Sequence, residues 1–112
     1  MTLRRLNPVT VLNEHLRVDA LRLLPLGNET LVVSGTVAQL APPDDTEFAI
    51  VTIEEEPIRI WVDGTGPTAA IGHRLDVTDV VVLESVEQIA GFRAIAVGTD
   101  ATLSVSYFER AL

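Results

Sequence analysis

The stretch Thr46–Asp63, TEFAIVTIEEEPIRIWVD, decides the fold class. Its first limb alternates in direction, with Phe48 and Ile50 on one side and the intervening apolar residues on the other. Its second limb alternates in the same way, and Trp61 shares its side with two charged residues. This period of two is typical of a β-strand, whereas a helix requires apolar residues three and four apart. Pro57 would also break a helix, so the stretch predicts two strands joined at Glu54–Pro57.

The rest of the chain repeats this pattern and predicts an all-β fold. Strands are expected at the following segments, with a possible bulge at Gly35: Thr30–Leu40, Val80–Glu84, Phe92–Val97 and Ala101–Phe108. The paired apolar residues of 80–84 indicate a strand covered on both faces. Turns are expected at Leu26–Glu29 and, as a glycine hairpin with a positive φ, at Gly98–Asp100. Residues 64–75 predict a long shaped loop, and Ser85–Gly91 predicts a connection that tucks Val86 and Ile89 against the core. The sequence therefore predicts a single small antiparallel β-sandwich or jelly-roll-like barrel.

The N-terminal quarter lacks this clean period. Residues 1–15 are expected to form an extended N-terminal arm, and residues 16–112 the β-sandwich domain. Residues 16–26 fit two structures, because Asn13 would cap a short helix that ends at Pro25, while alternation at Leu16, Val18 and Ala20 fits a strand. Extended structure is favoured because everything downstream is β.

Composition excludes several classes of protein. The chain has 112 residues, of which 47% are hydrophobic, so one globular domain is expected. No cysteine is present, which excludes thiolate catalysis and cysteine-ligated metal sites. No apolar run approaches the roughly 18 residues that span a bilayer, and no secretory leader is recognisable, so no membrane partner is expected.

The net charge of −8 is unevenly distributed along the chain. Residues 1–26 contain four arginines and two acidic residues, whereas residues 27–112 contain four arginines and fourteen acidic residues. An acidic body repels phosphates, so no nucleic-acid partner is expected. The mildly basic leading segment is a candidate for docking on an acidic surface, with Leu3, Arg4, Arg5 and Leu6 as candidate contacts.

The motifs of catalysis are missing from the sequence. It contains neither a G-x-S-x-G turn nor an H-E-x-x-H, and its histidines are His15 and His73. Three aspartates, Asp63, Asp76 and Asp79, would suit calcium by chemistry, but their spacing matches no calcium loop, and turn roles are favoured. We therefore expect no enzyme activity, no cofactor and no metal.

Two aromatic residues are candidate partner contacts. Trp61 lies on the polar side of its strand, and Phe108 lies on the Thr/Ser side of the last strand. Each is expected to be partly exposed or covered by another strand or subunit, as aromatic contact residues often are.

Four segments, read in order, resemble a known pattern: IRIWVDGTGPTA at 58–69, GHRL at 72–75, FRAI at 92–95 and ATLSVSYF at 101–108. They are similar to the small β-sandwich virion proteins of tailed bacteriophages, which carry an I-R-Y-x-x-D-G-T-x-P-T-A turn, a G-H-x-L and a closing A-T-L-x-V-x-Y-F strand. The resemblance covers about residues 33–108. Trp61 stands where tyrosine is common, and Thr78 stands where a glycine often precedes the aspartate.

The resemblance implies a structural role in a virion. The expected function is that of a capsid decoration (cement) protein that bridges subunits of the major capsid protein at the capsid surface, after synthesis in the host cytoplasm. Such proteins typically form homo-oligomers, with a trimer favoured here. The alternative is a tail or fibre accessory module that binds a glycan or a host surface, with Trp61 as its platform.

Overall fold

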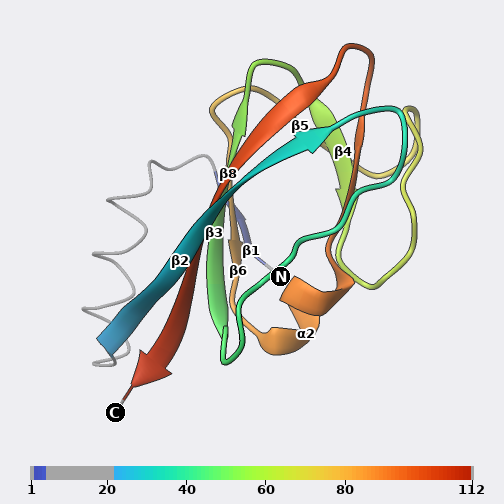
Figure 1. Ribbon diagram of the computed structural model, residues 1–112. Helices are drawn as coiled ribbons and strands as arrows, with labels where there is room; N and C mark the ends of the chain where they lie inside the picture. The colour runs from blue at the N-terminus through green and yellow to red at the C-terminus, as the bar shows by residue number, and fades with distance from the viewer. Residues whose placement is uncertain (1, 5–21, 112) are drawn as a thin grey trace.

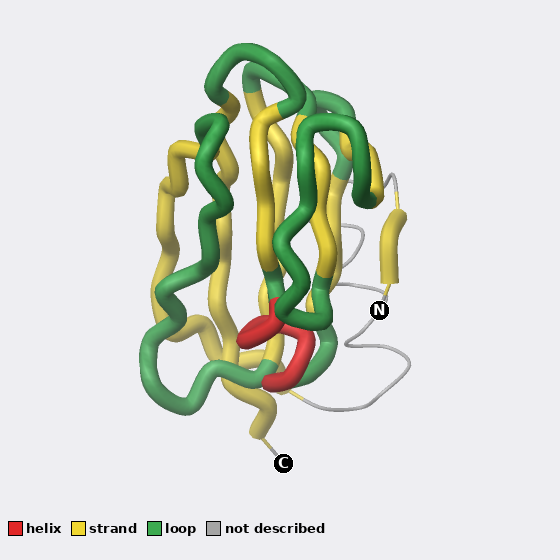
Figure 2. The backbone as a smooth tube through the Cα atoms, turned by 90° about the vertical axis from the view of Figure 1, so that its right-hand side faces the viewer, coloured by secondary structure: helices red, strands yellow, loops and turns green. Residues whose placement is uncertain are grey.

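In the computed structural model, residues 2–4 and 22–111 are described, and they form two antiparallel sheets packed face to face (Figure 1). The prediction of an all-β sandwich is confirmed. The larger sheet has five strands, in the order β1 (Thr2–Arg4), β6 (Val80–Leu83), β3 (Phe48–Glu54), β8 (Ala101–Ala111) and β2 (Arg22–Val33). The smaller sheet has three, in the order β5 (His73–Leu75), β4 (Ile58–Trp61) and β7 (Arg93–Ala96). One short helix, α2 (Val86–Gly91), lies at one end of the strands (Figure 2).

The two predicted tight turns carry the chain from one sheet to the other. The turn at Glu54–Pro57 links β3 in the larger sheet to β4 in the smaller one, and Glu55 adopts a positive φ of 73° there. The loop at Gly98–Asp100 links β7 to β8, which also belong to different sheets. The predicted hairpin at Gly98 is therefore wrong, and Gly98 does not have a positive φ. Strands in different layers need no two-residue hairpin turn, so the glycine conformation is not required.

Strand β2 begins and ends earlier than predicted. Residues 26–29, expected as a turn, lie inside it, and a bulge between Pro25 and Gly27 shifts its register against β8. Residues 22–26 are extended, as favoured above, while residues 16–21 lie outside the described residues. After Val33 the chain leaves the larger sheet, and Ala38 forms a bridge with Ala94 of β7. Residues 26–29 stay extended because their backbone forms hydrogen bonds with β8. Pro25 has no backbone N–H to donate, and the bulge that follows it accommodates this.

Two elements were not predicted at all. Residues 73–75, expected within a loop, form β5 by pairing with β4. Residues 86–91, expected as an irregular connection, form α2, whose first turn is capped by Ser85: its Oγ accepts a hydrogen bond from the backbone N–H of Gln88 at 3.1 Å. Ile89 is buried as predicted, but Val86 is exposed.

The main core lies between the two sheets, and every residue of β6 is buried, as predicted for 80–84. Tyr107, on the inner face of β8, is the polar exception in this core. Its hydroxyl donates a hydrogen bond to Glu29 of β2, and the same carboxylate accepts one from the N–H of Ala41 at 3.2 Å. Burial, followed by the nearby Glu29, raises the pKa of Tyr107 well above its ordinary value.

The raised pKa of Tyr107 predicts a loss of stability at alkaline pH. The unfolded chain releases the tyrosine proton near pH 10 and the folded chain holds it, so the contribution is complete below pH 10 and is lost above it. We expect the free energy of unfolding to fall more steeply above about pH 10 in the natural chain than in Tyr107→Phe. Urea unfolding across that range measures both, and the chain has no lysine to titrate alongside. Parallel profiles would contradict the prediction.

The turn before β6 holds a strained residue. Thr78 has a φ of 76°, which a β-branched residue rarely adopts, and its N–H donates to the carbonyl of Ile53 at 2.8 Å. We expect Thr78→Gly to raise the free energy of unfolding by about 0.5–1 kcal/mol, because relief of the left-handed strain exceeds the entropy that glycine adds to the unfolded chain. Thr99→Gly, at an exposed turn threonine without a positive φ, is the control and should lower stability. Equal effects in urea unfolding would contradict the strain.

Candidate contact face on the three-stranded sheet

The outer face of the smaller sheet carries an unusual set of side chains. In β4, Ile58 and Ile60 are fully buried against the core, so Arg59 and Trp61 point outward. The register places Arg59 opposite both Arg74 of β5 and Ile95 of β7, and Trp61 opposite Arg93. We call this set the Trp61 face: Arg59, Trp61, Arg74, Arg93 and Ile95. Three of its five members are arginines, on a protein whose net charge is −8.

Trp61 is half-buried and is held by a ring contact. Its indole meets the imidazole of His73 edge to face, with ring centroids 5.1 Å apart and planes at 70°. His73 lies at the start of β5 and is exposed. The structure confirms the predicted partial exposure of Trp61. An indole fixed in this way presents a flat apolar surface beside Arg93, the arrangement that suits stacking with a sugar ring or packing against a protein partner.

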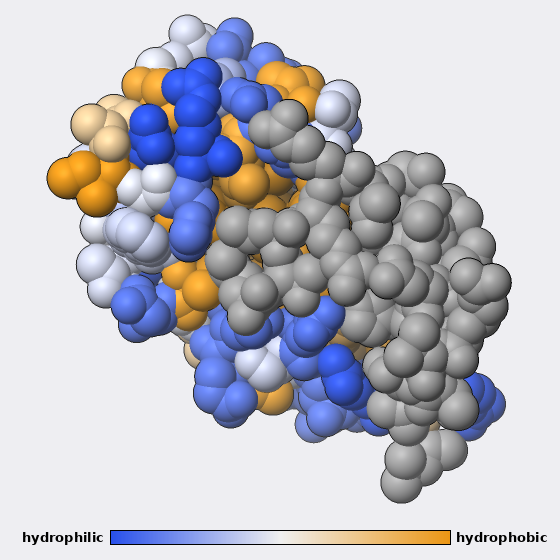
Figure 3. All heavy atoms as spheres, turned by 180° about the vertical axis from the view of Figure 1, so that it is seen from behind, coloured by the Kyte–Doolittle hydropathy of each residue, from blue (hydrophilic) through white to orange (hydrophobic). Residues whose placement is uncertain are grey.

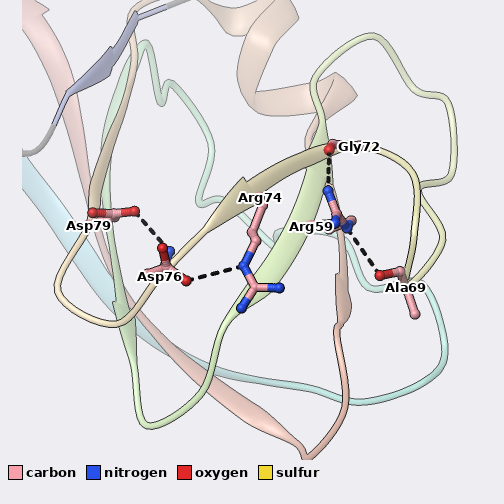
Figure 4. A network of polar contacts seen from close by, with 6 residues as sticks. All are labelled: Arg59, Ala69, Gly72, Arg74, Asp76 and Asp79. Carbon is pink, nitrogen blue, oxygen red and sulfur yellow. Dashed lines mark hydrogen bonds and ion pairs between the residues drawn. The ribbon is translucent and has the colours of Figure 1, made fainter.

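Arg59 is anchored by the loop that joins β4 to β5 (Figure 4). Its Nε donates to the carbonyl of Ala69 at 3.0 Å, and its Nη1 donates to the carbonyl of Gly72 at 2.9 Å. Gly72 has a φ of 133°, and an added Cβ would lie 3.1 Å from the carbonyl oxygen of Ile60. The guanidinium fork therefore binds a loop whose backbone only glycine fits easily.

The two neighbouring arginines have weaker or more local partners. Arg74 pairs with Asp76 at 3.2 Å (Figure 4), and both side chains are about half exposed. Arg93 donates from Nη1 to the carbonyls of Ala90 and Phe92, at 2.9 and 2.8 Å, at the end of α2. Arg59 and Arg74 lie directly opposite each other, and like charges in this position repel. Two backbone carbonyls bind Arg59 and the Asp76 carboxylate pairs with Arg74, and these contacts offset the repulsion.

The loop after β4 uses its polar groups internally. The Asp63 carboxylate accepts the N–H of Thr65 at 3.0 Å, and this hydrogen bond holds the pKa of Asp63 below its usual value. The N–H of Gly64 donates to the carbonyl of Gly91 at 2.9 Å. Asp79 similarly accepts the N–H of Asp76 at 2.8 Å. The predicted turn roles of Asp63 and Asp79 are thus confirmed.

Of the other candidate contacts, those that the structure describes lie on the larger sheet. Leu3 and Arg4 belong to β1, where their backbones align with Val81 and Val80 of β6; Arg5 and Leu6 lie outside the described residues. Phe108 is buried on the opposite face of the sheet from the core, with its ring 5.9 Å from that of Phe48 in a T-shaped contact. A partner role for these residues stays a prediction.

The sequence places Arg59 beside Trp61 on one side of their strand, but it does not connect them with Arg74 and Arg93. Arg74 is expected in a loop and Arg93 in a separate strand. Their gathering depends on the order β5-β4-β7, which joins segments separated by the whole of β6 and α2. A useful signal was present nonetheless, because Arg59, Arg74 and Arg93 all lie within the segments that carry the resemblance.

Within residues 2–4 and 22–111, no three histidine, aspartate or glutamate side chains converge in a way that would hold a metal ion. No helix in this part of the chain is long and apolar enough to cross a membrane. Comparisons with protein-family models, with curated proteins and with solved structures find no match for this chain.

Because Arg59 is anchored and Arg74 is not, we expect an Arg→Lys substitution to lower the free energy of unfolding more at Arg59 than at Arg74. Arg59→Lys loses the fork that bonds two carbonyls, and we expect it to lower the free energy of unfolding by about 1 kcal/mol and to speed amide exchange at Ile71. Arg74→Lys, on the opposing strand, alters only an exposed ion pair and should change stability by less than about 0.5 kcal/mol. Urea unfolding and hydrogen exchange measure both. A loop unaffected by Arg59→Lys would show that the fork does not hold it.

Proposed function

We propose that this chain is a non-enzymatic structural protein of a tailed-phage virion, a capsid decoration protein that stabilises the head by bridging subunits of the major capsid protein. The observation that carries the proposal is where the resembling segments lie. Three of them, at 58–69, 72–75 and 92–95, supply the three adjacent strands of the smaller sheet, and the fourth is most of β8. Segments far apart in the sequence thus belong to one compact unit, as expected if the resemblance reflects a shared fold.

The surface of this unit supports a role in contact. Six large apolar side chains are exposed in the described part: Leu24, Val32, Val37, Ile71, Val77 and Val86. Seen from behind, the described surface mixes hydrophilic and apolar residues (Figure 3). Such a protein binds weakly at each site and gains from a repeating lattice, where several copies or subunits engage at once. A self-associating trimer on the capsid surface fits this need.

The proposal predicts binding to capsid shells through the N-terminal basic residues. We expect the purified chain to sediment with empty shells of the major capsid protein encoded in the same genome, and the double variant Arg4→Glu/Arg5→Glu to bind about tenfold more weakly or worse. Charge reversal keeps the chain length, so β1 can still pair. The control is Arg22→Glu/Gln39→Glu/Thr99→Glu, which changes the net charge by the same amount at three exposed positions outside the Trp61 face.

Each result of this experiment is decisive. Binding that falls only in the Arg4/Arg5 variant supports the proposal and its contact residues. Binding that falls equally in the Arg4/Arg5 variant and in the control assigns the effect to net charge and overturns the contact assignment. The proposal itself is overturned by absence of binding to shells, or by a genome that encodes no major capsid protein.

The half-buried Trp61 favours one second candidate, a tail or fibre module that binds an acidic or neutral glycan. An indole flanked by arginines is a suitable platform for a sugar ring. A glycan array probed with the natural chain and with Trp61→Ala tests it: a signal lost in the variant supports the module, and no signal with the natural chain excludes it.

A further inference from the structure

Four acidic side chains gather at one end of the sandwich. They lie at the end of β3, in the turn that follows it, and in the loop from β7 to β8. The two connections are adjacent, because the N–H of Val97 donates to the carbonyl of Pro57 at 3.3 Å, and both lie at the upper end in Figure 1. We call this set the acidic tip: Glu54, Glu55, Glu56 and Asp100.

Two carboxylates of the acidic tip are held in place by β8. The hydroxyl of Thr102 donates to Glu55 at 3.2 Å, and the hydroxyl of Ser104 donates to Glu54. A carboxylate has about four lone-pair positions, so one accepted hydrogen bond leaves each of them able to bind an arginine. Glu54, Glu55 and Asp100 are exposed. Within the described part of the chain, no ion pair joins the acidic tip to an arginine.

Most arginines of the same part of the chain lie on another surface. Residues 27–112 contain four arginines and fourteen acidic residues, and three of the four arginines belong to the Trp61 face. Asp63 and Asp76 offset part of this positive charge. Arg59 uses two of its five N–H donors on loop carbonyls, so its guanidinium keeps donors for a further acceptor. One surface of the protein is therefore suited to binding carboxylates, and another is suited to presenting them.

We propose that the Trp61 face binds the acidic tip of a second copy of this chain. Guanidinium and carboxylate groups pair through charge-assisted hydrogen bonds, often two at once, and these are stronger than neutral ones. The half-buried indole of Trp61 beside Arg93 supplies an apolar centre, and tryptophan and arginine are among the residues that most often dominate binding energy. Copies with a net charge of −8 repel each other, so one complementary pair of surfaces selects the orientation in which they associate.

The contact joins two different surfaces, so it is head-to-tail. The acidic tip lies where β4 begins, whereas Trp61 pairs with Arg93 at the other end of β4. A head-to-tail pair still presents one acidic tip and one Trp61 face, so further copies add until a ring closes. The inference rests on the self-association that belongs to the proposed function, and it names the two surfaces that produce the favoured trimer.

Charge exchange between the two surfaces tests the contact on the pure chain. Light scattering should give the natural chain a mass that rises with concentration toward three times the 12.1 kDa of one chain. We expect the face variant Arg74→Glu/Arg93→Glu and the tip variant Glu54→Arg/Glu55→Arg each to associate about tenfold more weakly or worse. A mixture of the two variants should associate again, because the acidic tip of the face variant meets the natural Trp61 face of the tip variant.

A charge-matched control accompanies the two variants. Arg22→Glu/Thr30→Glu/Val86→Glu adds the same negative charge as the face variant, at three exposed positions outside both surfaces, and should associate like the natural chain. Urea unfolding shows whether each variant folds, and Arg74→Gln/Arg93→Gln replaces the face variant if charge reversal unfolds it.

Four results would overturn the proposal: a monomeric natural chain, an equal loss of association in the control, a face or tip variant that associates normally, or a mixture that stays monomeric. The experiment contains no capsid shells, so its failure is distinguishable from a failure of the proposed function.

Discussion

Burial of both faces of strand β3 is the constraint on which the rest of the structure depends. Phe48 and Ile50 face outward and Val51 and Ile53 face the smaller sheet, yet all four are buried. Strand β3 lies between β6 and β8 in the larger sheet, so its two faces join the main core on one side to a second apolar cluster on the other.

The same constraint explains why the polar contacts of the fold are concentrated at its ends. Beyond Ile50 the outer face of the sheet becomes polar: Ser104 and Thr102 donate hydrogen bonds to Glu54 and Glu55. On the inner side, Tyr107 reaches Glu29 where β2 and β8 pair. The apolar half of the outer face is thus clearly separated from the half that water can reach.

The strands with strong alternation could be predicted from the sequence, and the elements that depend on a partner could not. In residues 101–108 the alternation of apolar and polar side chains identifies the buried face of the strand, and in residues 80–83 the unbroken apolar run indicates burial of both faces. His73–Leu75 forms a strand only because β4 offers it an edge, and residues 26–29 stay extended only because β8 pairs with them across the bulge at Pro25. Gly98 lies between two strands, a pattern that predicts a hairpin, whereas the chain changes sheets there. Thr78 stands where the resembling proteins often have glycine, and the structure gives it a positive φ that no local pattern in this sequence predicts.

The Trp61 face was only partly predictable from the sequence. The pairing of β4 with β5 and β7 brings together residues that no local sequence pattern connects. Its side chains are nevertheless held in place more firmly than surface residues usually are. Arg59 binds two loop carbonyls, Arg93 binds two carbonyls at the end of α2, and Trp61 rests on His73. Side chains fixed before binding lose little conformational entropy when a partner arrives, so each contact retains more of its interaction energy. A preorganised cationic and aromatic surface on an acidic body also selects against partners with the wrong charge pattern. Under the proposed function, these properties would favour recognition of a repeated, defined surface over general adhesion, and they depend on the loop at Ala69–Gly72 keeping its conformation.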